Sequence, residues 1–247
     1  IVYCFGEERH PMTAADCAFF LTAENGLPVQ DEKGSFVLDE EAVTAYVQSL
    51  AEEYDGYGRT RQFHSTRGDV ITIDGGTYGS KMDRKKETAY LLEHLLDPGV
   101  HTGTPQSHIP SYEREAFCYG KNDIGDTYIE VDMTEQKMYY YEKGVLKLET
   151  EIVTGNMRRR MGTPEGVNFV YNKQKNRVLR GPGYASPVKF WMPVKGGIGI
   201  HDAGWRKEFG GDIYQTAGSH GCINTPKDKM EELFDCVQIG TPVVMFY

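Results

Sequence analysis

A cysteine and a histidine near the C-terminus have the types and spacing of a nucleophile and its base. Cys222 lies within residues 219–224, SHGCIN, and His201 ends an apolar segment upstream of it. A cysteine nucleophile needs a base for its proton, a group that orients the base, and N–H donors for the oxyanion. Asp202 could orient His201 through its carbonyl or its carboxylate. Because Gly221 permits a tight turn, its N–H and that of Cys222 could face an oxyanion, so the set predicts acyl transfer through a cysteine.

The residues that follow Cys222 have the pattern of a helix start. Thr225 is a suitable N-cap, Pro226 a suitable first helical residue, and Asp228 the matching partner in a capping box. We therefore expect Cys222 to lie just before a helix N-terminus. The partial positive charge there favours thiolate over thiol, which would leave the sulfur largely ionised near neutral pH.

Several alternatives remain open for this segment. His220 is closer in the chain to Cys222 than His201 is, so either imidazole could act as the base. The two histidines and Cys222 could instead bind zinc, although no fourth ligand has suitable spacing. A sortase would place an arginine soon after its cysteine, and no arginine follows Cys222. A papain-like hydrolase would place its histidine far downstream of the cysteine, whereas here His201 comes first.

The elements that must position these residues are predicted as short strands. Residues 127–133 alternate, with Tyr128, Glu130 and Asp132 on the side opposite the apolar residues, which predicts a half-buried strand. Further strands are predicted over residues 137–141, 145–154, 167–171, 189–194, 197–201 and 242–247, and a helix over about 226–237. Short strands separated by Gly and Pro favour a sandwich or barrel. We therefore expect residues 125–247 to form a mainly β domain.

Residues 1–124 are predicted to form a separate α+β domain. The sequence favours helices over 11–25, 39–54 and 82–97 and a strand over 69–74, with Thr13 and Asp39 as N-caps. Residues 98–124 are rich in Gly, Pro, Ser and His, and we expect them to connect the two domains. This half of the sequence offers no convergent set of catalytic side chains.

The composition indicates a folded protein that does not bind nucleic acid. Hydrophobic residues make up 39% and charged residues 26% of the chain, and the net charge of −9 opposes binding to phosphates. No apolar run reaches the ~18 residues of a membrane helix. The chain begins at Ile1 rather than Met, so we expect that an upstream segment was removed or never included, and an export signal or a membrane anchor could have been part of it. In an exported protein Cys4 and Cys17 could pair, whereas we expect Cys118 and Cys236 to be small buried apolar residues.

Residues 200–202, IHD, and 219–224, SHGCIN, resemble the active-site signature of the L,D-transpeptidases, the YkuD-type domains. The resemblance covers roughly residues 126–247 and includes residues 162–166, GTPEG, which look like the TPxG stretch of that family. It implies two mixed sheets packed as a sandwich, with the catalytic cysteine on a loop that enters a short helix. The first half resembles the peptidoglycan-binding-type domain often found upstream, at residues 63–66, 69–74 and 75–79.

The resemblance implies roles for individual residues. Cys222 would be the nucleophile and His201 the base, with the carbonyl of Asp202 orienting the imidazole. The catalytic turn would be shaped by Ser219, His220 and Gly221. The N–H groups of the last two and of Cys222 would form the oxyanion hole.

The resemblance also implies a substrate. Cys222 would attack the third residue of a peptidoglycan tetrapeptide stem, expel the terminal D-Ala and pass the acyl group to a side-chain amine of a neighbouring stem, giving a 3→3 cross-link. Water as acceptor would make the enzyme an L,D-carboxypeptidase, and a degenerate site would leave a wall-binding protein without turnover. No metal or organic cofactor is needed, and carbapenems should acylate Cys222. The protein would act outside the cell, at the cell wall or the outer face of the cytoplasmic membrane, in cell-wall organisation and cell shape.

Four further residues are candidates for substrate binding. Residues 203–218 could form a wall or lid of the site, in which Trp205 either lines the donor site or packs the loop. Tyr184 and Trp191 could line the donor groove. Asn224 is a candidate contact, although many family members have arginine at this position, and the asparagine weakens a carboxylate-binding role.

Overall fold

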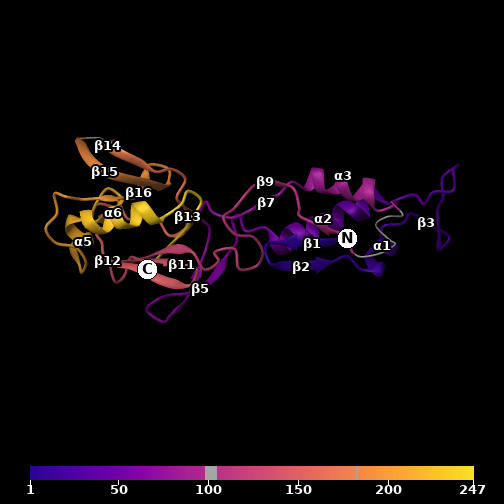
Figure 1. Cartoon of the computed structure of the whole chain (residues 1–247), viewed down its shortest axis with the longest axis horizontal. Helices are drawn as coiled ribbons and strands as arrows, with labels where there is room; N and C mark the ends of the chain where they lie inside the picture. The colour runs from indigo at the N-terminus through magenta and orange to yellow at the C-terminus, as the bar shows by residue number, and fades with distance from the viewer. Residues whose placement is uncertain (98–104, 182) are drawn as a thin grey trace. The chain divides into compact units, whose positions relative to one another are not determined.

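The computed structural model describes residues 1–97, 105–181 and 183–247 (Figure 1). They form two compact units, of which one comprises Ile1–Gly56 with Gly79–Asp123 and the other Tyr57–Tyr78 with Ile124–Tyr247. The predicted boundary after residue 124 lies next to the division between Asp123 and Ile124. Residues 57–78, however, belong to the second unit, whereas the sequence placed them in the first.

The first unit combines three helices with short strands in its described part. Its elements are β1 (Val2–Phe5), β2 (Glu8–Pro11), α1 (Ala14–Phe19), β3 (Ala23–Glu24), β4 (Leu27–Pro28), α2 (Glu40–Tyr54), β7 (Lys81–Met82), α3 (Arg84–His94), β8 (Ser107–His108) and β9 (Tyr112–Arg114). The strand order β2-β1-β8 makes a small sheet in which β1 pairs antiparallel with β2 and parallel with β8. The predicted α+β class is therefore correct.

The helix α2 shows why this unit folds locally as the sequence predicts. Asp39 Oδ1 accepts hydrogen bonds from the N–H groups of Glu41 and Ala42, so the side chain caps the helix. Val43, Val47 and Leu50 share one face and are buried. By contrast, α1 has the capping box expected at Thr13 but ends at Phe19, well before the predicted end at residue 25.

Three expectations, two about cysteines and one about the connecting segment, are wrong. Cys4 and Cys17 are not paired, since all five cysteines are free thiols, and Cys236 is exposed rather than buried. Residues 98–124 are also more than a connection, because β8 and β9 lie within them and pair with strands of the first unit. Residues 98–104 lie outside the described residues.

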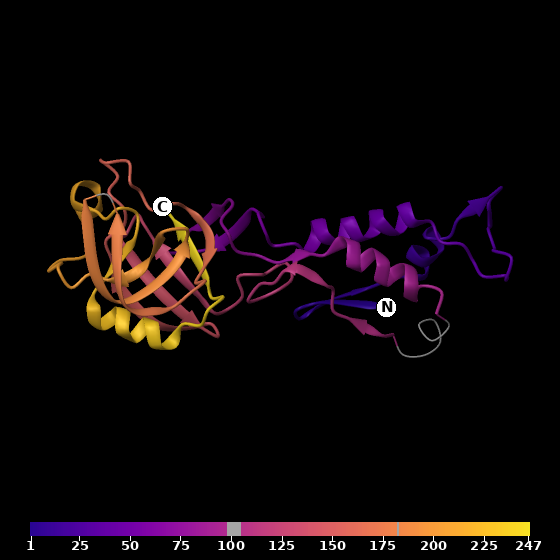
Figure 2. The same cartoon turned by 90° about the horizontal axis from the view of Figure 1, so that it is seen from above.

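The second unit is a sandwich of two mixed sheets, as predicted. Its elements are β5 (Arg61–His64), β6 (Val70–Ile73), β10 (Tyr128–Asp132), β11 (Lys137–Glu142), β12 (Val145–Glu151), β13 (Gly166–Phe169), β14 (Gln174–Gly181), β15 (Tyr184–Lys195), β16 (Ile198–Asp202), α5 (Ile213–Ala217), β17 (Ile223–Thr225), α6 (Lys227–Cys236) and β18 (Pro242–Phe246). One sheet has the order β12-β11-β10-β18-β13 and the other β14-β15-β16-β17. A single apolar core draws side chains from both sheets and from α6. The helix α6 contacts β15 and β16, beside which it lies in Figure 2.

Both faces of β10 are buried, which the alternating sequence did not predict. Ile129 and Val131 enter the apolar core, but Glu130 and Asp132 on the opposite face are also 0% exposed. The hairpin of β5 and β6 covers these carboxylates. Thr66 in its turn donates to Glu130 through both its N–H, at 2.8 Å, and its hydroxyl, at 2.7 Å.

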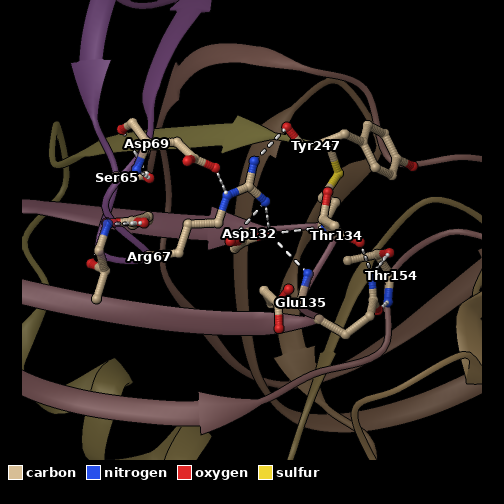
Figure 3. A network of polar contacts seen from close by, with 12 residues as sticks. Ser65, Arg67, Asp69, Asp132, Thr134, Glu135, Thr154 and Tyr247 are labelled. Carbon is tan, nitrogen blue, oxygen red and sulfur yellow. Dashed lines mark hydrogen bonds and ion pairs between the residues drawn. The ribbon is translucent and has the colours of Figure 1, made fainter.

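Arg67, in the same turn, joins the hairpin to the sheet (Figure 3). Its Nη1 lies 3.0 Å and 3.2 Å from the two carboxylate oxygens of Asp132, and its Nη2 donates to the carbonyl of Tyr247 at 3.2 Å. The N–H groups of Thr134 and Glu135 also donate to Asp132 Oδ1. These paired charges explain why residues 57–78 fold with the second unit, since a buried carboxylate needs donors to offset its lost hydration.

The sheet containing β16 and β17 positions the chemistry identified in the sequence. These strands pair in parallel, and the register sets His201 opposite Asn224 and Asp202 opposite Thr225. Residues far apart in the chain are thereby fixed side by side on rigid elements. In the described residues no helix has the length and apolar character to span a membrane.

Candidate active site

A pocket of about 200 Å³ opens beside the end of β16. The described residues that line it are Leu179, Tyr184, Ser186, His201, Trp205, Arg206, Gly218, Ser219, His220, Cys222 and Asn224. The pocket therefore holds the predicted cysteine together with both candidate histidines. It also contains Arg206, which the sequence reasoning did not select.

His201 is held in one orientation by hydrogen bonds to both ring nitrogens. Its Nδ1 lies 2.9 Å from the carbonyl oxygen of Asp202, which can only accept, so Nδ1 carries the proton. Asn224 Nδ2 lies 3.2 Å from Nε2 and therefore donates to its lone pair. The carbonyl of Asp202, rather than its carboxylate, thus fixes the imidazole tautomer. The carboxylate instead accepts from the N–H groups of Lys189 and Phe190, which ties β16 to β15.

His201 is also electrostatically suited to accept a proton. Its side chain is only 3% exposed, and this burial lowers its pKa below the ordinary value. The hydrogen bond to Asp202 opposes the effect, whereas the charge of Arg206 adds to it. Burial is the largest of these effects on the pKa, so the imidazole is neutral near neutral pH and its Nε2 is unprotonated.

The turn before Cys222 is stabilised by Ser219. Ser219 Oγ accepts from the N–H of Gly221 at 3.0 Å and donates to the carbonyl of Cys222 at 2.6 Å. Gly221 has a φ of +111°, which strains any residue with a Cβ. The N–H of Gly221 is therefore used within the turn, contrary to its expected place in an oxyanion hole. The N–H groups of His220 and Cys222 donate to no partner among the described residues.

The loop that contains residues 162–166, which resemble the TPxG stretch, is hydrogen-bonded to the same turn. Thr163 Oγ1 donates to the carbonyl of Gly221 at 2.8 Å and accepts from the N–H of Gly155 at 2.9 Å. The N–H of Asn156 donates to the carbonyl of Ser219. The threonine of the motif thus helps to fix the conformation of the turn.

The thiol of Cys222 is neutral at rest, which corrects the expectation of a thiolate. Burial raises its pKa, and a hydrogen bond from the backbone of Gly199 opposes this only in part. Its Sγ lies 3.8 Å from the carbonyl oxygen of Gly197, and in the described structure no hydrogen bond joins it to an imidazole.

The helix after Cys222 begins one residue later than predicted and lacks the expected cap. Thr225 belongs to β17, so the predicted capping box with Asp228 does not form. The N-cap of α6 is Pro226, without a side-chain cap. The strand β17 therefore separates Cys222 from the helix, and the influence of a helix terminus falls off within its first turn.

The remaining predicted residues differ in their relation to the pocket. Tyr184 stacks on His220, with ring centroids 4.6 Å apart, so that this histidine lies at the exposed mouth. Trp205 is 52% exposed and lines the rim, with its ring centroid 5.9 Å from that of His201. Trp191 does not line the groove as predicted. It is buried, and its ring centroid lies 5.8 Å from that of His201, so it packs against the imidazole.

The zinc alternative is not supported by the arrangement of ligands. Across residues 1–97, 105–181 and 183–247, no three His, Cys, Asp or Glu side chains are grouped to hold a metal ion.

Comparisons with known proteins agree with this geometry. A family model described as "L,D-transpeptidase catalytic domain" matches residues 126–245. A mutant of Enterococcus faecium L,D-transpeptidase, solved as a crystal structure, is 36% identical over 99% of this chain and 94% of that chain, with a TM-score of 0.83. This chain belongs to the L,D-transpeptidase family. A second similar structure, the "Ldtfm-avibactam carbamoyl enzyme", is 37% identical over 100% of this chain and 92% of that chain, also with a TM-score of 0.83.

A second family model concerns the N-terminal half of this L,D-transpeptidase. The model described as "Putative peptidoglycan binding domain" matches residues 23–99. That match extends across both compact units, because residues 57–78 fold with the catalytic unit. Among curated proteins, no sequence matches the chain.

Proposed function

We propose that this L,D-transpeptidase cross-links peptidoglycan through a Cys222 thioester. The observation that carries the proposal is the pocket that both the Cys222 thiol and the neutral imidazole of His201 line. The match of one half to a peptidoglycan-binding family and of the other to the catalytic family supports the wall as the substrate. The covalent avibactam adduct of a similar structure supports a nucleophilic mechanism.

The acylation step uses His201 as a general base rather than a preformed ion pair. Because both groups are neutral at rest, the proton of Cys222 passes to His201 Nε2 as Sγ attacks the carbonyl carbon of the third stem residue. Asn224 must yield its place on Nε2 in this step, while Asp202 retains Nδ1. The resulting imidazolium then gives its proton to the departing amine of D-Ala, which breaks the amide bond and leaves the thioester.

The N–H groups of His220 and Cys222 are the proposed donors to the oxyanion. Neither donates within the described structure, and both belong to the turn fixed by Ser219. Fixed donors at a developing oxyanion typically contribute about 3 kcal/mol each to lowering the barrier. Tyr184 and Trp205 lie at the mouth and rim of the same pocket, and we assign them to contact with the donor stem.

In the second half-reaction a side-chain amine of a neighbouring stem attacks the thioester. His201 accepts a proton from this amine, and the thiol of Cys222 regains a proton as the new amide forms. Water in place of the amine would give the tripeptide instead. Transfer to the amine therefore depends on the site holding the acceptor and limiting water, which is the role proposed for residues 203–218.

The place of action follows from the substrate. A protein that cross-links stems acts on the cell wall, and we propose that it does so at the outer face of the cytoplasmic membrane. Such cross-linking would contribute to cell-wall organisation and cell shape.

Mass spectrometry of products from purified disaccharide-tetrapeptide tests the proposal. We expect a cross-linked dimer with loss of D-Ala from the native protein and unchanged substrate from Cys222→Ala. Tripeptide alone would identify the enzyme as a carboxypeptidase. Unchanged substrate with the native protein would instead favour a wall-binding protein without turnover.

A further inference from the structure

Arg206 reaches the active-site pocket from the segment that the sequence identified as its wall. Its Nε donates to Asn224 Oδ1 at 2.7 Å, and its Nη2 donates to the carbonyl of Ala217 at 2.9 Å. Asn224 in turn donates to His201 Nε2. The guanidinium is therefore held in a fixed orientation, one side chain away from the proposed base.

The hydrogen bonds of Arg206 leave part of its guanidinium available. Nε and Nη2 share one edge of the planar group, and that edge is used by Asn224 and Ala217. The edge formed by Nη1 and Nη2 keeps N–H groups that could bind a carboxylate in a bidentate pair. Arg206 is only partly exposed, and burial lowers its pKa, which indicates that its charge is incompletely hydrated.

Arg206 is also the one permanently charged side chain among the described residues that line the pocket. The other lining residues are apolar, uncharged, or histidine and cysteine. A pocket of about 200 Å³ with one oriented guanidinium is suited to a small group with one negative charge.

We propose that Arg206 forms a subsite for the terminal carboxylate of the donor stem. This inference rests on the proposed function, since the terminal residue of the donor is the one that Cys222 would expel. In that residue only the amide nitrogen and one Cα separate the scissile carbonyl carbon from the carboxylate carbon. A carboxylate bound at Arg206 therefore belongs to the residue that leaves, and the subsite selects donors that end one residue beyond the attacked carbonyl.

The subsite also links donor binding to the strength of the base. The charge of Arg206 disfavours the protonated form of His201 and so contributes to the lowering of the imidazole pKa. A bound carboxylate neutralises that charge and removes this contribution. His201 thus becomes a stronger base when a donor with a free terminal carboxylate is bound.

The position of Arg206 also bears on Asn224, which the sequence identified as a candidate substrate contact. Asn224 follows Cys222 closely and carries no charge, but it holds Arg206 through its side-chain oxygen. A guanidinium is therefore present beside Asn224 although it originates from a different segment of the chain.

The test compares two donors that differ only at the terminal group, the tetrapeptide acid and its C-terminal amide. With the native protein we expect kcat/KM for the acid to exceed that for the amide by about 10- to 100-fold, as for hydrogen bonds to a charged group. Arg206→Ala should bring this ratio close to one. Arg206→Lys should restore part of it, because lysine supplies the charge without the bidentate fork. Lys207→Ala, at the adjacent exposed position, is the matched control and should keep the native ratio.

The ratio distinguishes a binding role from a structural one. If Arg206 only supported the loop, Arg206→Ala would slow both donors equally, and that result would overturn the inference. Equal use of the two donors by the native protein would overturn it as well, while leaving the proposed function intact. A native protein that turns over neither donor and forms no carbapenem adduct would overturn both.

Discussion

Asn224→Asp places a carboxylate where an amide now donates to the proposed base. Asn224 Nδ2 lies 3.2 Å from His201 Nε2, and both side chains are buried. A pair of unit charges at this distance is worth about 1 kcal/mol in water and about 5 kcal/mol at an effective dielectric constant of 20. Arg206 Nε, 2.7 Å from Asn224 Oδ1, would neutralise part of the new charge, so we expect the lower part of this range. A tenfold change in the proton-binding constant corresponds to about 1.4 kcal/mol. The imidazole of the variant should therefore bind a proton roughly 10- to 100-fold more tightly.

The sign of the effect on activity follows from the protonation state of His201. In the native protein burial lowers the pKa of His201, so the imidazole is neutral and accepts the proton of Cys222. The added carboxylate favours imidazolium and raises this pKa. The acidic limb of the pH–rate profile should therefore move to higher pH, and acylation at neutral pH should slow. The measurements are the rate of carbapenem acylation as a function of pH and an NMR titration of the His201 ring.

Asn176→Asp is the matched control for this variant. Asn176 is exposed on β14, so the same change of charge should leave both the acylation profile and the His201 titration unchanged. The reasoning is refuted if the titration of His201 does not move in Asn224→Asp, or if it moves equally in the two variants.

Three further predictions follow from the same structure. Burial raises the pKa of the Cys222 thiol, so its alkylation by iodoacetamide should be slow at neutral pH, and the alkylation rate should keep rising above pH ~8.5. Peptide mapping follows the reaction, and a plateau of the rate below that pH would contradict a neutral thiol. Arg67→Ala leaves the buried carboxylate of Asp132 with only backbone donors, so it should lower the free energy of unfolding, measured in urea, by about 3 kcal/mol. A loss below about 1 kcal/mol would contradict this role of Arg67. Gly221→Ala should slow acylation at least tenfold while the protein stays folded, because its φ of +111° strains any residue with a Cβ. Gly144→Ala, also at positive φ but with no atom near the added methyl, should keep the native acylation rate.

The mainly β class of residues 125–247 could be predicted because most strands are short and separated by clear turns, whereas the choice of a sandwich over a barrel came from the family resemblance. The expected strand over residues 127–133 became β10, and the expected helix over 226–237 became α6. The alternating pattern nevertheless suggested one exposed face for β10. Glu130 and Asp132 are buried because Thr66 and Arg67 satisfy them from a distant hairpin, and such long-range pairing leaves no local signal in the strand itself.

The candidate site was predictable in its residues but not in its electrostatics. The segment around Cys222 and the His201–Asp202 pair identified several of the residues that line the pocket, among them Cys222 and His201. The favourable cap residues at Thr225 and Pro226 predicted a helix too early, because pairing of β17 with β16 outweighs the local preference. Burial, which the sequence does not show, raises the pKa of the Cys222 thiol.

Arg206 was missed for a related reason. A single basic residue in a loop is usually solvated, and only the fold shows that it turns inward to Asn224. Its position four residues after Asp202, within the segment expected to form the wall, was the one available signal. Trp191, predicted to line the groove, is a buried residue of β15 whose ring packs against His201, and the sequence alone does not show which side of the strand is buried.

Intact-protein and peptide mass spectrometry after exposure to a carbapenem tests the central claim most directly. The predicted result is one covalent adduct per native chain, located on the peptide that contains Cys222 and absent from Cys222→Ala. His201→Ala should remain folded and form the same adduct far more slowly. An adduct of equal yield in Cys222→Ala, or no adduct on the native protein, would contradict the assignment of Cys222 as the nucleophile.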